Sequence, residues 1–392
     1  MGDQAQQIDR SSRGFMGYDQ FQIQLRELDE KGRHRRLRGR SGTDFTSNDY
    51  LGLAESDELR QAATEAIARG VPVGAGGSRL LRGNHPEHEA LETEAAGYFG
   101  AETALYFGAG YTANHAIFST LPQRGDIVLH DVLVHASVHE GLRYCRAPHE
   151  SVSHNDASAF DARLTQWRQA GGRGRPWIAV ESVYSMDGDS PDIAALVAVA
   201  DRHDAVLVVD EAHATGVLGP DGRGLAAPFE GRDNIITLHT CGKALGTSGG
   251  FVLGPRIVRD FLVNRARPFI FATAPSPLIA AVTRAALRIS RERPERRQRL
   301  AHLVAHAARE LKTRCGLDAS PSHILPIIVG ADSKAVALAA SLQQQGFDVR
   351  AIRPPTVPEG TARLRIALSA SLNETVISEL FEATAGALRQ LS

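Results

Sequence analysis

The sequence predicts an α/β fold in which helices cover a mostly parallel central sheet, with a smaller α+β domain at the C-terminal end. Short apolar runs alternate with helical patterns over most of the chain, as in sheets that are buried on both faces. The chain has 392 residues, more than one core usually supports. The pattern changes after a long helical region, and this change indicates the second domain.

The first elements along the chain are expected to be helical. An amphipathic helix is predicted over residues 17–38 and a second helix over 57–69, before the glycine-rich loop 74–78. The apolar residues at helical spacing in the first of these are Phe21, Leu25, Leu28 and Leu37.

The large domain is expected to contain six strands, each a short apolar run followed by a loop or helix. Active sites in such sheets lie at the carboxyl ends of the strands, so the polar residues that follow them are candidates for function. The candidate strands are 103–107, 126–129, 177–181, 205–210, 235–239 and 250–253.

A long helical region at 276–314 is expected to lead into the small domain, which has fewer strands. Its strand candidates are 324–329, 348–352 and 364–368. The predicted division is an N-terminal helical segment over 1–47, a large cofactor-binding domain over 48–285 and a small C-terminal domain over 286–392.

Composition excludes several classes of protein. A net charge of −1 gives no reason to expect binding to nucleic acid or to an anionic membrane. The cysteines Cys145, Cys241 and Cys315 are too few and too scattered for a disulfide framework or a metal site. The polar N-terminus has no secretory signal, and no stretch is apolar enough to span a membrane. A cytoplasmic protein is therefore expected.

The clearest chemical signal surrounds one lysine. Lys243 lies in a loop of small residues that directly follows a candidate strand, and an earlier apolar run ends in Asp210-Glu211-Ala212-His213. A lysine that loses its proton near neutral pH can form a Schiff base with an aldehyde cofactor, and a carboxylate can keep the cofactor's ring nitrogen protonated. Lys243 and Asp210 together predict pyridoxal phosphate chemistry.

Two other patterns were weighed against this interpretation. The segment 210–213 also matches a helicase-type Mg²⁺ box, but the phosphate loop that this box requires is missing, since alanine follows Lys243. The segment Gly108-Ala109-Gly110-Tyr111-Thr112-Ala113 fits a nicotinamide-dinucleotide fingerprint, so a dehydrogenase is a distant alternative. The same glycines, at the opening of a helix, could present backbone N–H groups to a cofactor phosphate.

His135 and Ser185 are candidates because of where they lie in the chain. Each follows a predicted strand, and each taken alone would be assigned a structural role. Five strand ends in a row bring polar groups to one edge of the sheet, and both residues are therefore included in the predicted site. No metal site is predicted.

With these residues in view, the chain resembles the α-oxoamine synthase family of fold-type-I pyridoxal-phosphate transferases. The resemblance extends over nearly the whole length, from residue 20 to residue 385. Its motifs are 47-Ser-Asn-Asp-Tyr-Leu-Gly-Leu-53, 76-Gly-Gly-Ser-Arg-79, 185-Ser-Met-Asp-Gly-Asp-189, 210-Asp-Glu-Ala-His-Ala-Thr-Gly-216, 240-Thr-Cys-Gly-Lys-243, and the C-terminal segments 352–358 and 362–365.

The resemblance implies a role for each residue around the cofactor ring. Lys243 would be the Schiff-base lysine and the proton shuttle. Asp210 would pair with the pyridinium nitrogen, and His213 would hydrogen-bond the phenolic oxygen. His135 would stack on the ring, and Ser185 would lie close to the phenolic oxygen.

The resemblance also implies how the cofactor phosphate is held. The N–H groups of Gly110 and Tyr111 and the hydroxyl of Thr240 would bind it, and Thr273 would reach it from the neighbouring subunit. A homodimer with shared active sites is therefore expected. Family members often carry a hydroxyl at position 272, where this chain has alanine.

Four further residues are implied as substrate-binding. Arg365 would clamp the carboxylate of the amino acid with support from Asn48, because a guanidinium group matches a carboxylate in shape. Arg35 would meet the far end of the acyl substrate, and Thr356 would lie near the acyl site.

The implied reaction joins an amino acid to an acyl thioester and releases CO₂ and free thiol. The segments 353–356 and 76–79 favour the branch that condenses L-alanine with a pimeloyl thioester in biotin biosynthesis, delivered by coenzyme A or by an acyl carrier protein. Serine palmitoyltransferase, glycine C-acetyltransferase and 5-aminolevulinate synthase share the same cofactor chemistry and remain alternatives. A catalytically inactive binding subunit is a more distant one.

Overall fold

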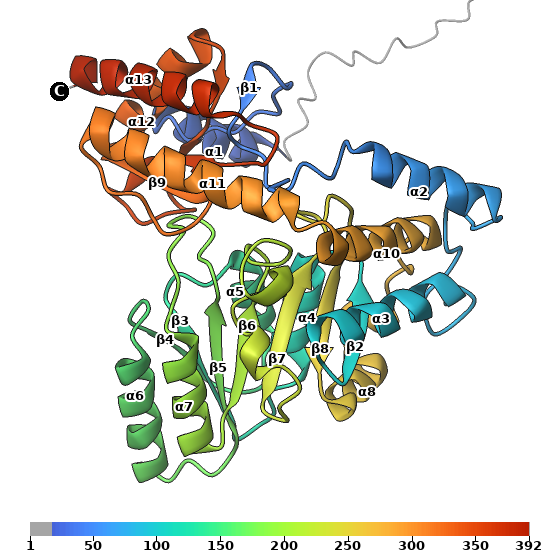
Figure 1. Ribbon diagram of the computed structural model, residues 1–392. Helices are drawn as coiled ribbons and strands as arrows, with labels where there is room; N and C mark the ends of the chain where they lie inside the picture. Colours follow the sequence, from blue (N-terminus) through green and yellow to red (C-terminus); the bar gives the residue numbers. More distant parts are fainter. Residues whose placement is uncertain (1–17, 392) are drawn as a thin grey trace, which may run out of the picture.

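The computed structural model describes residues 18–391 and contains a seven-stranded sheet with helices on both faces (Figure 1). The strand order is β2-β8-β7-β6-β5-β3-β4. Within this sheet β8 is antiparallel to both of its neighbours, and the other neighbouring pairs are parallel. The strands are β2 (Thr103–Phe107), β3 (Ile127–Asp131), β4 (His149–Val152), β5 (Pro176–Glu181), β6 (Val206–Asp210), β7 (Ile235–Thr240) and β8 (Gly250–Gly254). The predicted mostly parallel sheet is confirmed.

Both faces of the sheet are covered because its strands are apolar on both sides. Alternate residues of β6 separate into two buried clusters: Val206 and Val208 lie in one, and Leu207 and Val209 in the other. The helices on the first face are α4 (Gly110–Thr120), α5 (Ala136–Arg143), α8 (Arg256–Arg265) and α9 (Arg267–Ile270). Those on the second face are α6 (Ala157–Gln169) and α7 (Ile193–His203).

A third apolar cluster lies beside the β2 and β8 edge and continues into the C-terminal part of the chain. It includes Tyr106 and Phe251 of the sheet, Leu303 of α11 and Phe381 of α13. The helices that pack around it are α2 (Asp57–Ala68), α3 (Pro86–Phe99), α10 (Pro277–Glu292), α11 (Glu295–Glu310), α12 (Asp332–Gln344) and α13 (Glu374–Leu391). The core is therefore continuous across residue 285, and the division at 1–47, 48–285 and 286–392 remains a prediction.

The C-terminal part has its own antiparallel sheet, in the order β11-β12-β9. The predicted strand 348–352 is wrong, because the chain turns at Val349 and forms two short strands with different partners. One of them pairs with β1, near the N-terminus, and the other with β12. The strands are β1 (Thr43–Asp44), β9 (Ile324–Gly330), β10 (Phe347–Asp348), β11 (Ala351–Ile352) and β12 (Ala362–Ala367).

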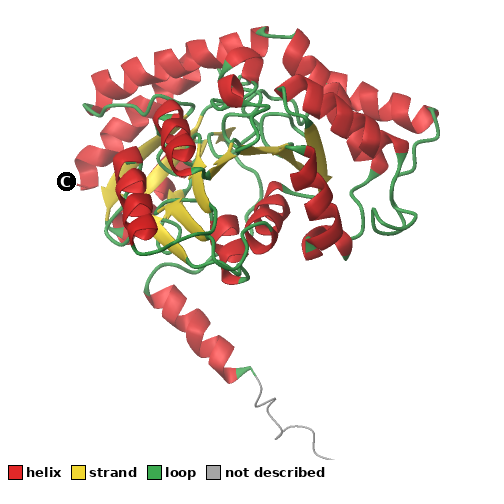
Figure 2. Cartoon of the chain, turned by 90° about the horizontal axis from the view of Figure 1, so that it is seen from below, coloured by secondary structure: helices red, strands yellow, loops and turns green. Residues whose placement is uncertain are grey.

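The first helix is shorter than predicted. α1 (Asp19–Glu30) ends where Gly32 adopts a left-handed conformation with φ of +64°, and the segment after it has no regular structure up to β1. No residue of α1 is buried, and the helix stands away from the body of the chain (Figure 2). The prediction for residue 17 lies outside the described residues.

The rest of the chain follows the sequence pattern more closely. The predicted helix 57–69 is confirmed as α2, and the long helical region divides into α10 and α11 at Pro294. Two 3₁₀ turns at Pro220–Gly222 and Ala227–Phe229 and a π-helical turn at Leu311–Cys315 complete the helices of the described chain. Among residues 18–391, no helix has both the length and the apolar character that a membrane crossing needs.

The core packing predicts a clear difference between two leucines. Leu207 of β6 is fully buried, and truncation to alanine removes buried methyl groups and leaves a cavity. We expect Leu207→Ala to lower the free energy of unfolding by about 2–5 kcal/mol in denaturant titrations. Leu81 is 78% exposed, so Leu81→Ala should cost less than about 1 kcal/mol. Equal losses for the two variants would contradict this description of the core.

Candidate active site

The carboxyl ends of the parallel strands meet at one edge of the sheet and bring the predicted site residues together. The register aligns Glu181 of β5 with Asp210 of β6, and Asp210 with Leu238 of β7. The loop after β7 carries Lys243, and the loop after β6 carries His213. These two side chains meet, with Lys243 Nζ 2.8 Å from His213 Nε2.

A further hydrogen bond joins His213 to Tyr50, near the N-terminus. The Tyr50 hydroxyl lies 2.6 Å from His213 Nδ1 and 2.9 Å from Asn48 Oδ1. Burial lowers the pKa of His213 well below its usual range, and the charges of Lys243 and Arg365 lower it further. A neutral imidazole has one donor and one acceptor nitrogen. His213 can therefore accept a hydrogen bond from one of its two neighbours, Lys243 and Tyr50, and donate a hydrogen bond to the other.

The environment of Lys243 suits an amine that must lose its proton. Burial lowers the pKa of Lys243 to about 8, the negative charge of Asp210 opposes this shift, and the charge of Arg365 adds to it. The side chain itself is only partly buried. A substantial fraction of the amine is therefore neutral near physiological pH, as attack on an aldehyde requires.

Asp210 is held by fixed donors. Its Oδ1 accepts a hydrogen bond of 2.9 Å from the N–H of Ala212, and its Oδ2 accepts one of 2.7 Å from the side-chain amide of Asn114. Glu181 lies beside it on the next strand, and burial raises the pKa of Glu181 well above its usual range, with the charge of Asp210 adding to the shift. Burial therefore favours the neutral, protonated form of Glu181 next to the side chain of Asp210.

The N-terminus of α4 forms a cradle of backbone groups. The residue before the helix is Ala109, whose methyl group cannot accept a hydrogen bond. The first N–H groups of α4 are therefore not capped by the side chain of the N-cap residue. The loops approach each other closely: a Cβ atom on Gly250 would lie 2.8 Å from Gly110 N, and one on Gly110 would lie 3.4 Å from Thr240 Oγ1. The close approach of Gly250 and Gly110 brings the Thr240 side chain next to the first residue of α4. A helix N-terminus with a hydroxyl beside it suits a phosphate group.

His135 stands at the rim of this site as the N-cap of α5. Its Nδ1 lies 2.8 Å from Ser137 Oγ and accepts from the Ser137 N–H at 3.3 Å. The ring is exposed in this chain and meets Tyr111 edge to face at 6.2 Å. The protein that surrounds the ring partly desolvates it and lowers the pKa of His135.

Strand β12 contributes Arg365, which is 7% exposed. Its Nε donates to the carbonyl of Ser185 at 2.6 Å, and its Nη2 donates to Asn48 Oδ1 at 3.0 Å and to the Tyr50 hydroxyl at 3.3 Å. Arg363 points the same way, two residues earlier on β12, and forms an ion pair with Asp187. β12 is therefore fastened to the loop that follows β5.

The remaining predicted residues lie further out. Arg35 Nη2 donates to Thr356 Oγ1 at 3.1 Å, so the N-terminal arm and the proline-rich segment meet, and both residues are exposed. Thr273 is exposed in the loop between α9 and α10. Any contact of Thr273 with a cofactor of a second chain remains a prediction.

Four residues of this site were missed from the sequence: Tyr50, Asn114, Ser137 and Glu181. Asn114 follows Gly110 by one helical turn and therefore lies on the same face of α4, a signal that helical spacing could have given. Glu181 is the last residue of β5, as Asp210 is of β6. Ser137 contacts His135, and Tyr50 contacts His213. Residues that act only through another side chain follow no recognisable pattern in a single sequence.

Two aspartates and a histidine tie the loops of this edge together. His154 Nδ1 lies 2.9 Å from Asp131 Oδ1, and His154 Nε2 lies 2.8 Å from Asp189 Oδ2. Asp131 precedes the loop that carries His135, and Asp189 ends the loop that carries Ser185. Burial opposes the charged form of His154, but the two hydrogen bonds outweigh it and raise its pKa to about 10.

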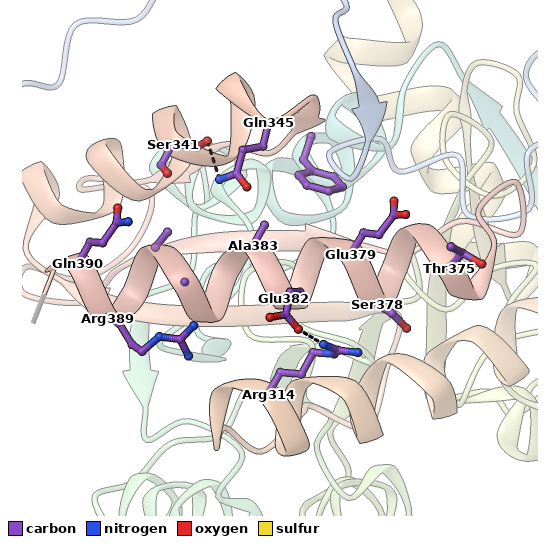
Figure 3. A pocket seen from close by; sticks show the side chains of 13 residues that line it. Arg314, Ser341, Gln345, Thr375, Ser378, Glu379, Glu382, Ala383, Arg389 and Gln390 are labelled. Atoms are coloured by element: carbon purple, nitrogen blue, oxygen red, sulfur yellow. Dashed lines mark hydrogen bonds and ion pairs between the residues drawn. The ribbon is translucent and has the colours of Figure 1, made fainter.

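A different cavity, of about 890 Å³, lies in the C-terminal part of the chain (Figure 3). Arg314 pairs with Glu382 at its wall, and Gln345 donates to the carbonyl of Ser341. Its lining residues contain none of the residues predicted for the active site. Its chemistry is therefore separate from that of Lys243.

The chain belongs to the aminotransferase class I and II family, whose sequence model matches residues 40–383. Its curated relatives include 8-amino-7-oxononanoate synthases. The protein of that name from Chromobacterium violaceum is 45% identical over 360 residues, with 88% of this chain and 92% of the relative covered. The one from Anaeromyxobacter dehalogenans is 40% identical over 389 residues, with 95% and 96% covered.

Solved structures show the same fold. A serine palmitoyltransferase from S. paucimobilis, whose structure includes pyridoxal phosphate, superposes with a TM-score of 0.86 at 27% identity and covers 95% of this chain and 98% of its own. An 8-amino-7-oxononanoate synthase from Francisella tularensis superposes with a TM-score of 0.75 at 26% identity, covering 90% and 99%. The predicted family and the fold-type-I architecture are confirmed.

The His154 contacts predict a stability difference that depends on pH. A pKa raised from 6.5 to about 10 in the folded chain means that the charged ring stabilises the fold fully below pH 6.5, and that this contribution is lost as the pH rises through 10. We expect His154→Gln to lower the thermal midpoint at pH 7, and the deficit relative to the wild type should shrink as the pH approaches 10.

His203 offers a matched control. Its Nε2 lies 2.8 Å from Asp161 Oδ1, at the end of α7 and away from the Lys243 site. His203→Gln removes a comparable contact without touching the loops of the active site. A His154→Gln deficit that stays constant between pH 7 and 10 would show that the charge of His154 does not stabilise the fold.

Proposed function

We propose that this protein is a pyridoxal-phosphate-dependent acyltransferase. It condenses L-alanine with a pimeloyl thioester to give 8-amino-7-oxononanoate, CO₂ and free thiol, a step of biotin biosynthesis. The observation that carries the proposal is the cluster at the ends of β6 and β7, where Lys243 Nζ lies 2.8 Å from His213 Nε2 and Asp210 is buried beside them. The names of the relatives at 40–45% identity support the choice of substrates.

The residues present fit pyridoxal phosphate. Without a Cβ atom, Gly250 packs directly against the backbone of Gly110, and this contact holds the N-terminus of α4 beside Thr240, where a phosphate would bind. Lys243 would hold the aldehyde, Asp210 the ring nitrogen and His213 the phenolic oxygen. His135 would cover the ring from the rim, and Ser185 would lie near the phenolic oxygen.

When bound, the cofactor would supply an electron sink for negative charge at the α-carbon of the amino acid. Lys243, with a pKa of about 8, can take a proton from that carbon and return one to the product. Asp210 would favour the protonated ring nitrogen, because a carboxylate raises the pKa of a neighbouring base. The neutral ring of His213 keeps a second positive charge away from Lys243.

Arg365 would orient the amino acid. Its bonds to Ser185, Asn48 and Tyr50 use Nε and Nη2, so a substrate carboxylate would be bound through Nη1. These bonds also fix the guanidinium plane before substrate binds, which lowers the entropy that binding costs. His135 would donate from Nε2 to the carbonyl of the acyl thioester.

A group of arginines supports an acyl chain with a carboxylate at its far end. Arg35 and Arg38 donate to the neutral oxygens of Thr356 and Gln343, and Arg353 donates to the carbonyl of Gly32. Burial lowers the pKa of Arg353, the negative charge of Asp332 opposes this shift, and the charges of Arg35 and Arg38 add to it. Positive charge without a carboxylate partner suits the distal carboxylate of a pimeloyl group and not the apolar end of a palmitoyl group.

Serine palmitoyltransferase is the second candidate, because its structures superpose with the higher TM-score of 0.86. A TM-score compares backbones, however, and the backbone is shared by enzymes with different acyl substrates. Identity of 27% to that enzyme against 45% to a synthase favours pimeloyl transfer. We therefore place serine palmitoyltransferase activity second, ahead of glycine C-acetyltransferase and 5-aminolevulinate synthase activity.

We further propose a cytoplasmic homodimer in which Thr273 of the partner subunit completes each phosphate site. Two observations support it: Thr273 is exposed, and the neighbouring Phe271 is 69% exposed, as expected of residues that a second chain would cover. An acyl carrier protein as the acyl donor also remains a proposal.

Replacement of Lys243 tests the cofactor assignment. Lys243→Ala should remove the visible absorbance of the protein-bound cofactor and lower turnover by about a thousandfold or more, because both attachment and proton transfer are lost. Lys334→Ala, at an exposed lysine on α12, should leave both unchanged. The measurements are an absorption spectrum with added pyridoxal phosphate and the release of free thiol. A fully active Lys243→Ala variant would exclude the mechanism.

A panel of substrates tests the acyl assignment. Free thiol should be released from pimeloyl-CoA with L-alanine and not from palmitoyl-CoA with L-serine. Arg35→Leu should lower kcat/KM about tenfold for pimeloyl-CoA, through loss of a charged contact, and change it little for heptanoyl-CoA, which lacks the distal carboxylate.

Arg40 provides the control for this substitution. It is exposed and pairs with Glu55, so Arg40→Leu should not change the preference between the two thioesters. Equal losses for pimeloyl-CoA and heptanoyl-CoA in Arg35→Leu would show that Arg35 does not bind the carboxylate. Preference for palmitoyl-CoA with L-serine would replace the proposed function with its second candidate.

A further inference from the structure

Asn114 joins two parts of the active site: Asp210 at the end of β6, and Ser137 in the first turn of α5. It lies on α4, is 2% exposed, and its side-chain nitrogen donates to Asp210 Oδ2 at 2.7 Å and to Ser137 Oγ at 3.0 Å. The nitrogen must face Asp210, because a rotated amide would place its oxygen against a carboxylate oxygen. Both donor hydrogens of the amide are therefore used inside the site.

Ser137 continues this connection to His135. Since Ser137 Oγ accepts from Asn114, its own hydroxyl hydrogen is free to be donated to His135 Nδ1 at 2.8 Å. The Ser137 N–H donates to the same nitrogen at 3.3 Å. Two donors on Nδ1 leave no place for a proton there, so His135 is held as the tautomer that carries its proton on Nε2.

The packing of α4 against α5 keeps these groups within reach. Gly141 of α5 faces α4 so closely that a Cβ atom on it would lie 2.9 Å from Phe118 Cβ and 3.3 Å from the backbone oxygen of Asn114. A larger residue at position 141 would push the helices apart. The absence of a side chain at Gly141 therefore sets the distance between Asn114 and Ser137.

We propose that Asn114 is a positioning residue that links Asp210 to His135. Its amide fixes the carboxylate that would hold the cofactor's ring nitrogen, and through Ser137 it fixes the tautomer of the histidine that would cover the ring. The inference rests on the proposed function, since it assigns a purpose to the two residues that Asn114 contacts. Asn114 itself acts only through them.

The charged and titratable groups around this link are Glu181 beside Asp210, Lys243 facing both Asp210 and His135, and His139 on α5. A buried carboxylate that loses a donor is weakened as a partner for the ring nitrogen. Asn114→Leu should therefore weaken the binding of pyridoxal phosphate about ten- to a hundredfold. Ser137→Ala should leave that affinity within about threefold but change the pH profile of kcat/KM, because Nδ1 of His135 loses one donor.

Asn114→Asp gives a test that keeps the shape of the side chain. When protonated, its carboxyl can donate to Asp210 as the amide does, and when ionised it repels Asp210. The affinity of this variant for pyridoxal phosphate, divided by that of the wild type at the same pH, should rise as the pH falls from about 8 to 6. Loss of packing alone would not give this dependence.

The experiment measures pyridoxal phosphate affinity by equilibrium dialysis and by visible absorbance for the wild type, Asn114→Asp, Asn114→Leu and a matched control. The control is Asn234→Leu, since the Asn234 amide also donates to an aspartate, Asp201 at 2.9 Å, but lies before β7 at the opposite edge of the sheet. It should bind like the wild type.

The outcomes separate the two proposals. A wild-type protein that binds no pyridoxal phosphate would overturn the proposed function. If the wild type binds it and Asn114→Asp shows an affinity ratio that does not change with pH, the role of Asn114 is overturned while the proposed function stands. If Asn114→Leu fails to fold, the pH dependence of Asn114→Asp decides the question alone.

Discussion

The placement of an amine beside a carboxylate at the ends of two adjacent parallel strands is the constraint on which the rest of this structure depends. A partly buried lysine is destabilised as a cation, and Asp210 limits that effect so that the pKa of Lys243 settles at about 8. The sheet makes this arrangement rigid because β6 and β7 are buried along their whole length. Loops on such a frame can hold reactive groups in place.

Strand β12, from the C-terminal part of the chain, adds side chains to this edge of the sheet. Arg365 of β12 reaches across to the carbonyl of Ser185 and to Asn48, while Arg363 pairs with Asp187. β12 thus carries Arg363, which fixes the loop after β5, and Arg365, whose guanidinium group lies near Lys243. The apolar cluster that runs from Tyr106 to Phe381 holds the two parts of the chain in this relation.

Much of this could be predicted from the sequence, because apolar strands and the residues that end them follow simple patterns. Asp210, His213 and Lys243 end or follow buried strands, and the structure brings Lys243 and His213 into contact. Ser137 and Tyr50 could not be predicted in this way, because they act through His135 and His213 and follow no recognisable pattern in a single sequence. The helix predicted to residue 38 failed because Leu37 continues the apolar spacing after Gly32 has ended the helix. The edge strand β4 was missed because its residues, His149-Glu150-Ser151-Val152, are largely polar and partly exposed.

The central claim is that Lys243 holds pyridoxal phosphate covalently. The most direct measurement is to incubate the protein with pyridoxal phosphate, reduce it with borohydride, digest it and locate the modified lysine by mass spectrometry. We expect one modified peptide, containing Lys243. Modification of Lys31, Lys312 or Lys334 in its place, or of no lysine, would contradict it.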